Sequence, residues 1–191
     1  MNLAMALTGG RIVLAPVFFL FYQLAARGST WAFPAVWAVV MLIELSDLLD
    51  GFVARRYGQE SELGKILDPC ADSIARITYF LCLSGSGILP LWILLVIIYR
   101  DVSVAYIRVM LSSRGFLMPA RLSGKLKAWV YAVAGIAGVA WFSLEKLGSG
   151  AAASVVLHDV LLGLFVASAA VALWSLADYF SFFRRNSRQT S

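Results

Sequence analysis

Charged residues are scarce in this sequence of 191 residues. Lysine, arginine, aspartate and glutamate together make up 14% of it, against about 25% in an ordinary soluble domain, whereas 61% of the residues are hydrophobic. The mean hydropathy is correspondingly high, at +0.82. This composition excludes a soluble globular domain and indicates an integral membrane protein.

Cysteine and histidine are also nearly absent, with two cysteines and one histidine in the whole sequence. Cys70 and Cys82 lie in or beside apolar helical sequence, where a cysteine behaves as a small buried side chain. So few residues cannot build a disulfide framework, and they cannot supply the usual ligands of a structural zinc site. The sequence therefore excludes a small domain stabilised by disulfides or by zinc.

The excess of basic residues is modest, with 16 lysines and arginines against 11 acidic residues and a net charge of +5. These basic residues stand beside long apolar runs, a pattern that is typical of membrane topology rather than of a nucleic-acid-binding surface. We therefore expect the protein to contact membrane lipids and not nucleic acid.

Six apolar runs of about the length needed to cross a bilayer are separated by short polar or glycine-containing joints. The runs cover residues 7–26, 31–55, 68–84, 89–111, 122–144 and 153–183. The sequence therefore predicts an all-α integral membrane protein with six transmembrane helices. We expect residues 1–183 to form a single domain and residues 184–191 a short basic tail.

The basic residues are distributed unequally over such a six-helix layout. Fourteen of the 16 fall on one side of the membrane or in the helix ends that reach it, and only Arg27 and Lys146 fall on the other. The side richer in lysine and arginine faces the cytoplasm. We therefore expect both termini, the tail and the second and fourth loops to be cytoplasmic.

Four aspartates form two pairs at helical spacing. Asp47 and Asp50 are three residues apart, and Asp68 and Asp72 are four apart, so each pair lies on one face of its helix. A carboxylate near the bilayer centre costs about 2.5–3.5 kcal/mol, which bound divalent cations would offset. Oxygen ligands favour Mg²⁺, Mn²⁺ or Ca²⁺, and two facing pairs suit a two-metal site acting on phosphate. The alternatives are solvated acids at helix ends, or the ion path of a cation transporter.

The same segment resembles the CDP-alcohol phosphatidyltransferase family, whose signature is D-x2-D-G-x2-A-R-x8-G-x3-D-x3-D. Every specified position is matched, by Asp47, Asp50, Gly51, Ala54, Arg55, Gly64, Asp68 and Asp72. The resemblance implies an enzyme of the bacterial inner membrane, with a polar active-site cavity that faces the cytoplasm. Residues 1–183 would then be its catalytic domain.

The resemblance also implies roles for the signature residues. The four aspartates would hold two Mg²⁺ or Mn²⁺ ions, and Asp72 would also be the catalytic base. Gly51, Ala54, Arg55 and Gly64 would bind CDP-diacylglycerol. The implied reaction is attack of an alcohol hydroxyl on the lipid-side phosphorus, with CMP as the leaving group. A homodimer is compatible with the family as well.

A second basic cluster follows the aspartates. Arg100 and Arg108 are eight residues apart on one predicted helix, an offset of about 80°, and Lys125 and Lys127 lie on the next. Such a cluster suits a phosphate-bearing acceptor, unless the lysines are simply positive-inside charge that contacts anionic headgroups. Its R-D-x6-R and G-K-x-K patterns are similar to the branch of the family that uses sn-glycerol 3-phosphate. Inositol phosphate or another alcohol is the alternative acceptor.

A few other polar residues stand near these motifs. Thr8 and Arg11 are similar to the opening of the same branch of the family. Glu44 comes one helical turn before the first aspartate pair, and Arg76 one turn after the second. Arg76 could balance a carboxylate or contact a substrate phosphate, whereas Asp178 has no partner that the sequence reveals.

Overall fold

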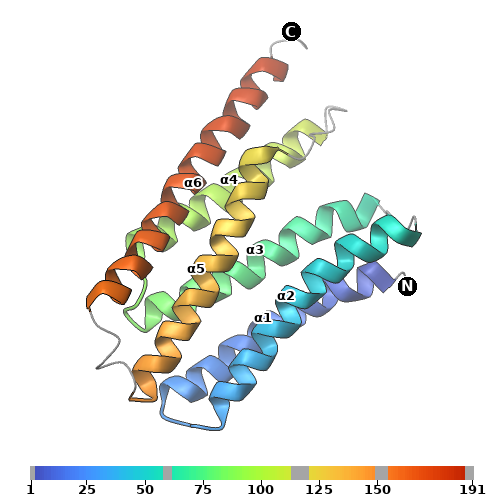
Figure 1. The fold of residues 1–191 in the computed structure, drawn as a ribbon. Coiled ribbons are helices and arrows are strands. Elements are labelled where there is room, and N and C mark those ends of the chain that lie inside the picture. Colours follow the sequence, from blue (N-terminus) through green and yellow to red (C-terminus); the bar gives the residue numbers. More distant parts are fainter. Residues whose placement is uncertain (1–2, 58–61, 113–120, 149–154, 188–191) are drawn as a thin grey trace. The chain divides into compact units, whose positions relative to one another are not determined.

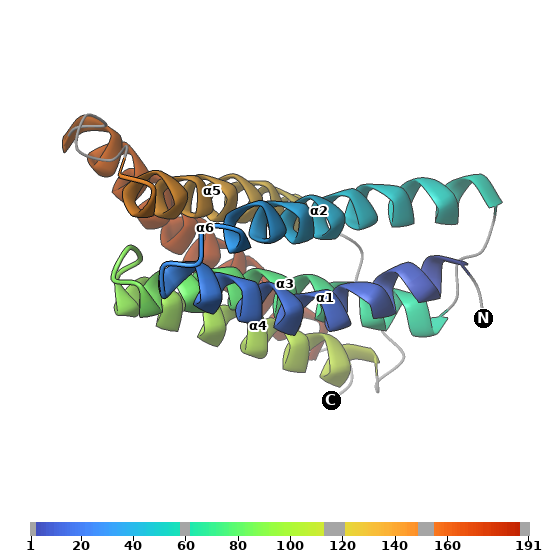
Figure 2. The same ribbon diagram turned by 90° about the horizontal axis from the view of Figure 1, so that it is seen from below.

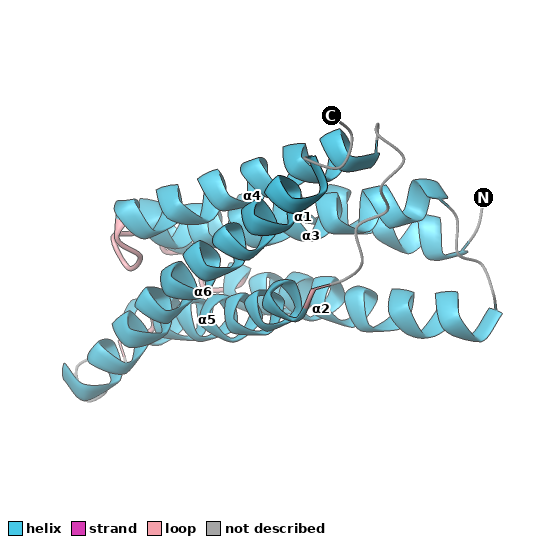
Figure 3. Cartoon of the chain, turned by 90° about the horizontal axis from the view of Figure 1, so that it is seen from above, coloured by secondary structure: helices cyan, strands magenta, loops and turns pink. Residues whose placement is uncertain are grey.

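The computed structural model of the chain describes residues 3–57, 62–112, 121–148 and 155–187. Within these helices, the description leaves out the side chains of residues 3–8, 48, 50–57, 62–68, 155 and 186–187. Helices make up nearly all of the described ranges, and no strand occurs in them (Figure 3). The prediction of an all-α protein is therefore confirmed for this part of the chain.

Six helices follow one another along the chain (Figure 1). They are α1 (Leu3–Ala26), α2 (Ala32–Tyr57), α3 (Glu62–Gly85), α4 (Leu91–Ser112), α5 (Leu122–Lys146) and α6 (Val155–Ser187). The largest difference from the predicted ranges is the start of α3, which lies six residues earlier. Residues 62–67 are too polar to form an apolar run, but glutamate, leucine and lysine all favour a helix.

Three helical segments are long and apolar enough to cross a membrane, among the residues that the structure describes. They are Gly9–Ala26 in α1, Leu122–Lys146 in α5 and Val156–Arg185 in α6. Many large apolar side chains are also exposed, as in a protein whose surface contacts lipid. The chain therefore has the features of an integral membrane protein.

Two compact units make up the chain. Unit 1 consists of Met1–Ile88 and Val139–Ala152, and unit 2 consists of Leu89–Gly138 and Ala153–Ser191. Helices α1, α2 and α3 therefore belong to unit 1, α4 and α6 belong to unit 2, and α5 contributes to both.

The core of unit 1 forms around α1, which lies beside both α2 and α3 (Figure 2). The buried residues of α1 recur every three or four positions, which keeps them on one face: Arg11, Ala15, Phe18, Tyr22 and Ala25. Phe18 meets Tyr79 of α3 edge to face, with 4.6 Å between ring centroids, and Tyr22 stacks on Phe142 at 4.1 Å. Arg11 is the one charged residue on this buried face.

Two glycines end helices of unit 1 at sharp turns. Gly28 has a φ of +97° and follows α1, and Gly87 has a φ of +77° and follows α3. In each turn the residue after the glycine donates its N–H to the carbonyl five residues back, and the glycine donates to the carbonyl three back. This pairing is the Schellman motif, whose left-handed position favours glycine.

Unit 2 is built on the contact between α4 and α6 (Figure 1). Its core contains buried residues from both helices, namely Val104, Ile107, Leu111 and Tyr179, with Leu176, Phe182 and Phe183 packed against them. Tyr179 is the polar member of this cluster, and it is fully buried.

Candidate active site

Two of the four signature aspartates meet at a buried arginine in unit 1. Arg11 of α1 has an exposed fraction of 1%. Its Nη1 atom donates to Asp47 Oδ1 of α2 at 2.8 Å, and the same atom donates to Asp72 Oδ1 of α3. The two carboxylates are about one third exposed. Aspartates 25 residues apart in sequence therefore converge on one cationic nitrogen.

A second arginine extends this cluster. Arg76 Nη2 of α3 lies 3.5 Å from Glu44 Oε2 and 3.7 Å from Asp47 Oδ2, both of α2. These side chains line a small cleft together with Arg11 and Asp72. Arg76 therefore forms ion pairs from α3 to α2, and Glu44 is one of its partners.

The other signature residues lie on the same two helices, but the structure does not describe their side chains. Asp50, Gly51, Ala54 and Arg55 belong to α2, and Gly64 and Asp68 belong to α3. Their roles in binding metal and CDP-diacylglycerol therefore stay predictions.

The described carboxylates of the cluster have the donor chemistry of a metal site. Among the described side chains, no three acidic, histidine or cysteine residues form a metal-binding group. However, the carboxylates of Asp47 and Asp72 both bond the positively charged guanidinium group of Arg11. Carboxylate oxygens are the donors that hard divalent ions require. Asp47 and Asp72 are two of the four predicted ligands, and the chemistry of their oxygen atoms suits such ions; their metal-binding role stays a prediction.

A buried charge cluster in unit 2 contains two of the predicted acceptor-binding residues. Asp101 of α4 is 5% exposed and accepts hydrogen bonds from Lys127 Nζ of α5, at 2.7 and 2.9 Å. It also accepts from Arg100 Nη1 at 2.9 Å, and Arg100 Nη2 donates to Ser175 Oγ of α6 at 2.6 Å. One carboxylate therefore holds two buried cations together.

The other two predicted residues differ in their surroundings. Arg108 of α4 donates from Nη2 to the hydroxyl of Tyr179 at 2.8 Å. The Tyr179 ring centroid is 5.4 Å from the Arg108 guanidinium carbon and 5.5 Å from that of Arg100. Lys125 is exposed on α5. Arg100, Arg108 and Lys127 are thus linked through Asp101 and Tyr179.

A third ion pair in unit 2 has no signal in the local sequence. Asp178 of α6 accepts two hydrogen bonds from Arg121, from Nε and Nη2 at 2.6 Å each, and a third from Ser123 Oγ at 2.6 Å. The bidentate geometry fixes the start of α5 against α6. Because 57 residues separate Arg121 from Asp178, no local spacing reveals the pair.

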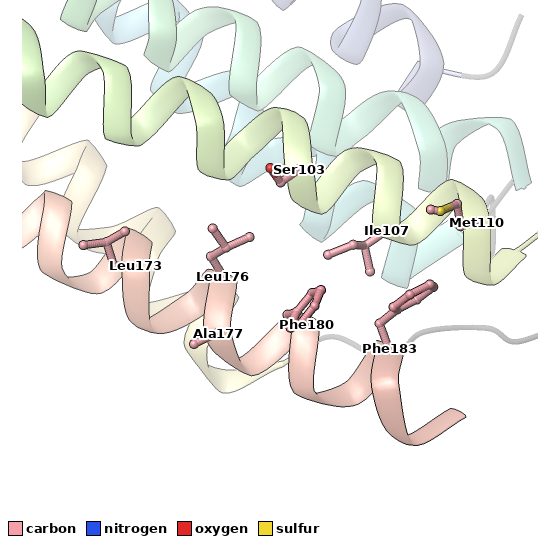
Figure 4. A pocket seen from close by; sticks show the side chains of 8 residues that line it. All are labelled: Ser103, Ile107, Met110, Leu173, Leu176, Ala177, Phe180 and Phe183. Carbon is pink, nitrogen blue, oxygen red and sulfur yellow. The ribbon is translucent and has the colours of Figure 1, made fainter. Parts of the chain in front are cut away.

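An apolar groove lies between α4 and α6 within unit 2, with a volume of about 540 Å³ (Figure 4). Its lining residues are Ser103, Ile107 and Met110 of α4, and Leu173, Leu176, Ala177, Phe180 and Phe183 of α6. Figure 4 shows Phe180 and Phe183 on the α6 side, with Ile107 and Met110 on the α4 side. Such a lining suits a hydrocarbon chain rather than a polar substrate.

A family model for CDP-alcohol phosphatidyltransferase matches residues 1–174. The chain belongs to the CDP-alcohol phosphatidyltransferase family. This match confirms the resemblance drawn from the signature, and it extends well beyond the signature segment to include most of the chain.

Several proteins similar to this chain come from bacteria. A Mycobacterium tuberculosis (strain H37Rv) protein, named "Probable phosphatidylglycerophosphate synthase", is 37% identical over 133 residues, or 70% of this chain. A Treponema pallidum protein, named "CDP-diacylglycerol-glycerol-3-phosphate 3-phosphatidyltransferase", is 35% identical over 141 residues, or 69% of this chain. A Streptomyces coelicolor "Cardiolipin synthase (CMP-forming)" is 38% identical over 85 residues, which cover 44% of this chain and 40% of that protein.

The first two of these similarities also cover much of the relatives themselves. The matched stretch spans 63% of the Mycobacterium protein and 65% of the Treponema protein, slightly less than two thirds of each.

Proposed function

We propose that this protein transfers a phosphatidyl group from CDP-diacylglycerol to sn-glycerol 3-phosphate, forming phosphatidylglycerophosphate and CMP. The convergence of Asp47 and Asp72 on one nitrogen of Arg11 carries the chemical part of the proposal. Membership of the family and the names of the Mycobacterium and Treponema relatives support the donor and the acceptor.

The proposed reaction is a single displacement at phosphorus. The acceptor hydroxyl oxygen attacks the lipid-side phosphorus, and the bond from that phosphorus to the oxygen of CMP breaks. Asp72 takes the hydroxyl proton as general base. Gly51, Ala54, Arg55 and Gly64 bind the CDP-diacylglycerol, with Arg55 beside its diphosphate.

Asp47, Asp50, Asp68 and Asp72 are the proposed ligands of two divalent ions, Mg²⁺ or Mn²⁺. When bound, such ions would neutralise negative charge on the phosphate oxygens. Arg11 donates hydrogen bonds to both Asp47 and Asp72, and Arg76 forms an ion pair with Glu44. These arginines hold the carboxylates in place against α1 and α3.

Chelation of metal is expected to stop the reaction. EDTA should lower CMP release by the purified protein by on the order of a hundredfold or more, because charge on the phosphates would no longer be neutralised. Excess Mg²⁺ or Mn²⁺ should restore it. A rate that is insensitive to EDTA would overturn the two-metal site.

The acceptor side of the proposal uses the basic residues of unit 2. Arg100, Arg108, Lys125 and Lys127 bind the phosphate of glycerol 3-phosphate. Arg108 is partly exposed and Lys125 is exposed, which allows contact with a small soluble acceptor. Arg100 and Lys127 are buried and share the single carboxylate of Asp101, so their part in binding the phosphate is a net positive charge held in a fixed position.

The proposed setting is a bacterial inner membrane that is crossed by all six helices. Residues 1–183 form the catalytic domain, and residues 184–191 form a basic cytoplasmic tail. The unequal distribution of lysine and arginine supports cytoplasmic termini and a cavity that opens to the cytoplasm. We also propose a homodimer, as the family implies.

Comparison of acceptors tests the proposed function. Purified protein with CDP-diacylglycerol and Mg²⁺ is expected to release CMP with glycerol 3-phosphate, and to release little with inositol 1-phosphate, inositol or serine. Only the first acceptor matches the relatives' names, and inositol and serine lack a phosphate for the basic cluster. Release with a different acceptor would keep the catalytic site but overturn the acceptor.

A lipid alcohol is the second candidate acceptor. Two observations favour it: the relative named cardiolipin synthase, and the apolar groove between α4 and α6, which could take an acyl chain. Phosphatidylglycerol in mixed micelles is therefore added to the acceptor comparison. Faster CMP release with phosphatidylglycerol than with glycerol 3-phosphate would favour this second reaction.

A further inference from the structure

Tyr179 is a fully buried tyrosine of α6 whose polar atom meets basic residues of the candidate acceptor site. Its hydroxyl oxygen accepts a hydrogen bond from Arg108 Nη2 at 2.8 Å. Its ring also lies within cation-π distance, about 6 Å, of the Arg108 and Arg100 guanidinium groups. One ring therefore contacts both arginines that α4 contributes to the cluster.

The ring of Tyr179 is held in place by apolar neighbours. It belongs to the core cluster with Val104, Ile107 and Leu111 of α4. Because a tyrosine side chain has only two rotatable torsions, packing of the ring also fixes the direction of the hydroxyl. The hydroxyl is therefore a rigid acceptor for Arg108.

The start of α5 also approaches this hydroxyl closely. A Cβ atom built on Gly124 would lie 2.9 Å from the Tyr179 oxygen, which is closer than real Cβ contacts. Gly124 stands immediately before Lys125 and three residues before Lys127. A glycine at this position therefore lets α5, with both lysines, lie directly against Tyr179.

We infer that Tyr179 is a positioning residue for the acceptor phosphate, acting through Arg108 and through its contact with Gly124. A guanidinium group has five donors, so one bond to a rigid oxygen can fix its plane while other donors face a phosphate. The contact with Gly124 sets the distance of the two lysines from Arg108. The inference rests on the proposed function, because the phosphate belongs to the proposed acceptor.

Removal of the hydroxyl tests this role. Tyr179→Phe is expected to raise the KM for glycerol 3-phosphate about tenfold, the effect of losing a hydrogen bond to a charged group. The kcat and the KM for CDP-diacylglycerol should change less than about twofold, since the lost interaction concerns binding of the acceptor. Tyr22→Phe is the matched control, because Tyr22 is also buried but its hydroxyl bonds Ser86.

A double-mutant cycle separates positioning from a general packing defect. Arg108→Gln should also raise the acceptor KM. If Tyr179 acts through Arg108, Tyr179→Phe should add little to the KM of the Arg108→Gln variant. Full additivity of the two effects would overturn the inferred route through Arg108.

The contact with Gly124 has a test that does not depend on activity. Gly124→Ala should lower the unfolding temperature, because its methyl group would meet the Tyr179 hydroxyl. Tyr179→Phe removes that oxygen, so Gly124→Ala should lower the unfolding temperature less in the Tyr179→Phe background than in the wild-type protein. An equal decrease in both backgrounds would overturn the close contact.

These outcomes distinguish the inference from the proposed function. If the wild-type protein releases CMP with glycerol 3-phosphate but Tyr179→Phe keeps the wild-type acceptor KM, the inference alone fails. If the wild-type protein releases no CMP with any phosphorylated acceptor, the proposed function fails and the phosphate-positioning role fails with it.

Discussion

Asp72→Asn is expected to lower the rate of CMP release at least about a hundredfold, the lower end of what general-base catalysis contributes. Asparagine has nearly the same shape but cannot take a proton, and it removes one of the two carboxylates that meet at Arg11. Asp47 would still pair with Arg11, so the helices should stay packed. Initial rates of CMP release by purified variants in detergent measure the effect.

Asp159→Asn is the matched control for this experiment. Asp159 belongs to α6, and its side chain is 68% exposed. The same change of charge there should leave both the rate and the unfolding temperature close to wild type. If Asp72→Asn released CMP within about threefold of the Asp159→Asn rate, Asp72 would not be the general base.

The second large effect is predicted for stability. Asp101→Asn should destabilise the protein by about 3–5 kcal/mol, the usual cost of removing one partner from a buried ion pair. Arg100 and Lys127 would both stay buried after losing the negative charge that they share. For a chain of this length, the unfolding temperature should fall by on the order of 10 °C.

Asp101→Glu tests whether charge is the cause. It restores the carboxylate one methylene further out, so it should recover a large part of the lost stability. Asp159→Asn is again the control, because it measures the effect of removing a carboxylate at an exposed position. Equal unfolding temperatures for Asp101→Asn and Asp159→Asn would mean that the buried cluster does not stabilise the fold.

Local patterns predicted much of the fold and part of the site. The six apolar runs predicted the six helices, because each helix contains a continuous stretch of apolar residues. The spacing of the aspartates placed each pair on one face of its helix, and in the structure Asp47 of one pair and Asp72 of the other both bond Arg11. The polar start of α3 was missed because hydrophobicity alone does not register it.

Pairings between distant residues could not be predicted in the same way. Arg108 and Tyr179 are 71 residues apart, and Arg121 and Asp178 are 57 apart. Each pair depends on the contact of α6 with α4 or α5, which no local motif encodes. Arg11 was recognised as part of an opening motif, but only the packing of α1 against α2 and α3 shows that it joins two aspartates.

Transfer of labelled glycerol 3-phosphate into lipid by the purified protein, with CDP-diacylglycerol and Mg²⁺, tests the proposed activity most directly. We expect a labelled phospholipid in equal molar amount to the CMP released, and almost none with Asp72→Asn. CMP release without labelled lipid would contradict the proposed acceptor. Absence of both products from folded, metal-loaded wild-type protein would contradict the proposed transferase activity.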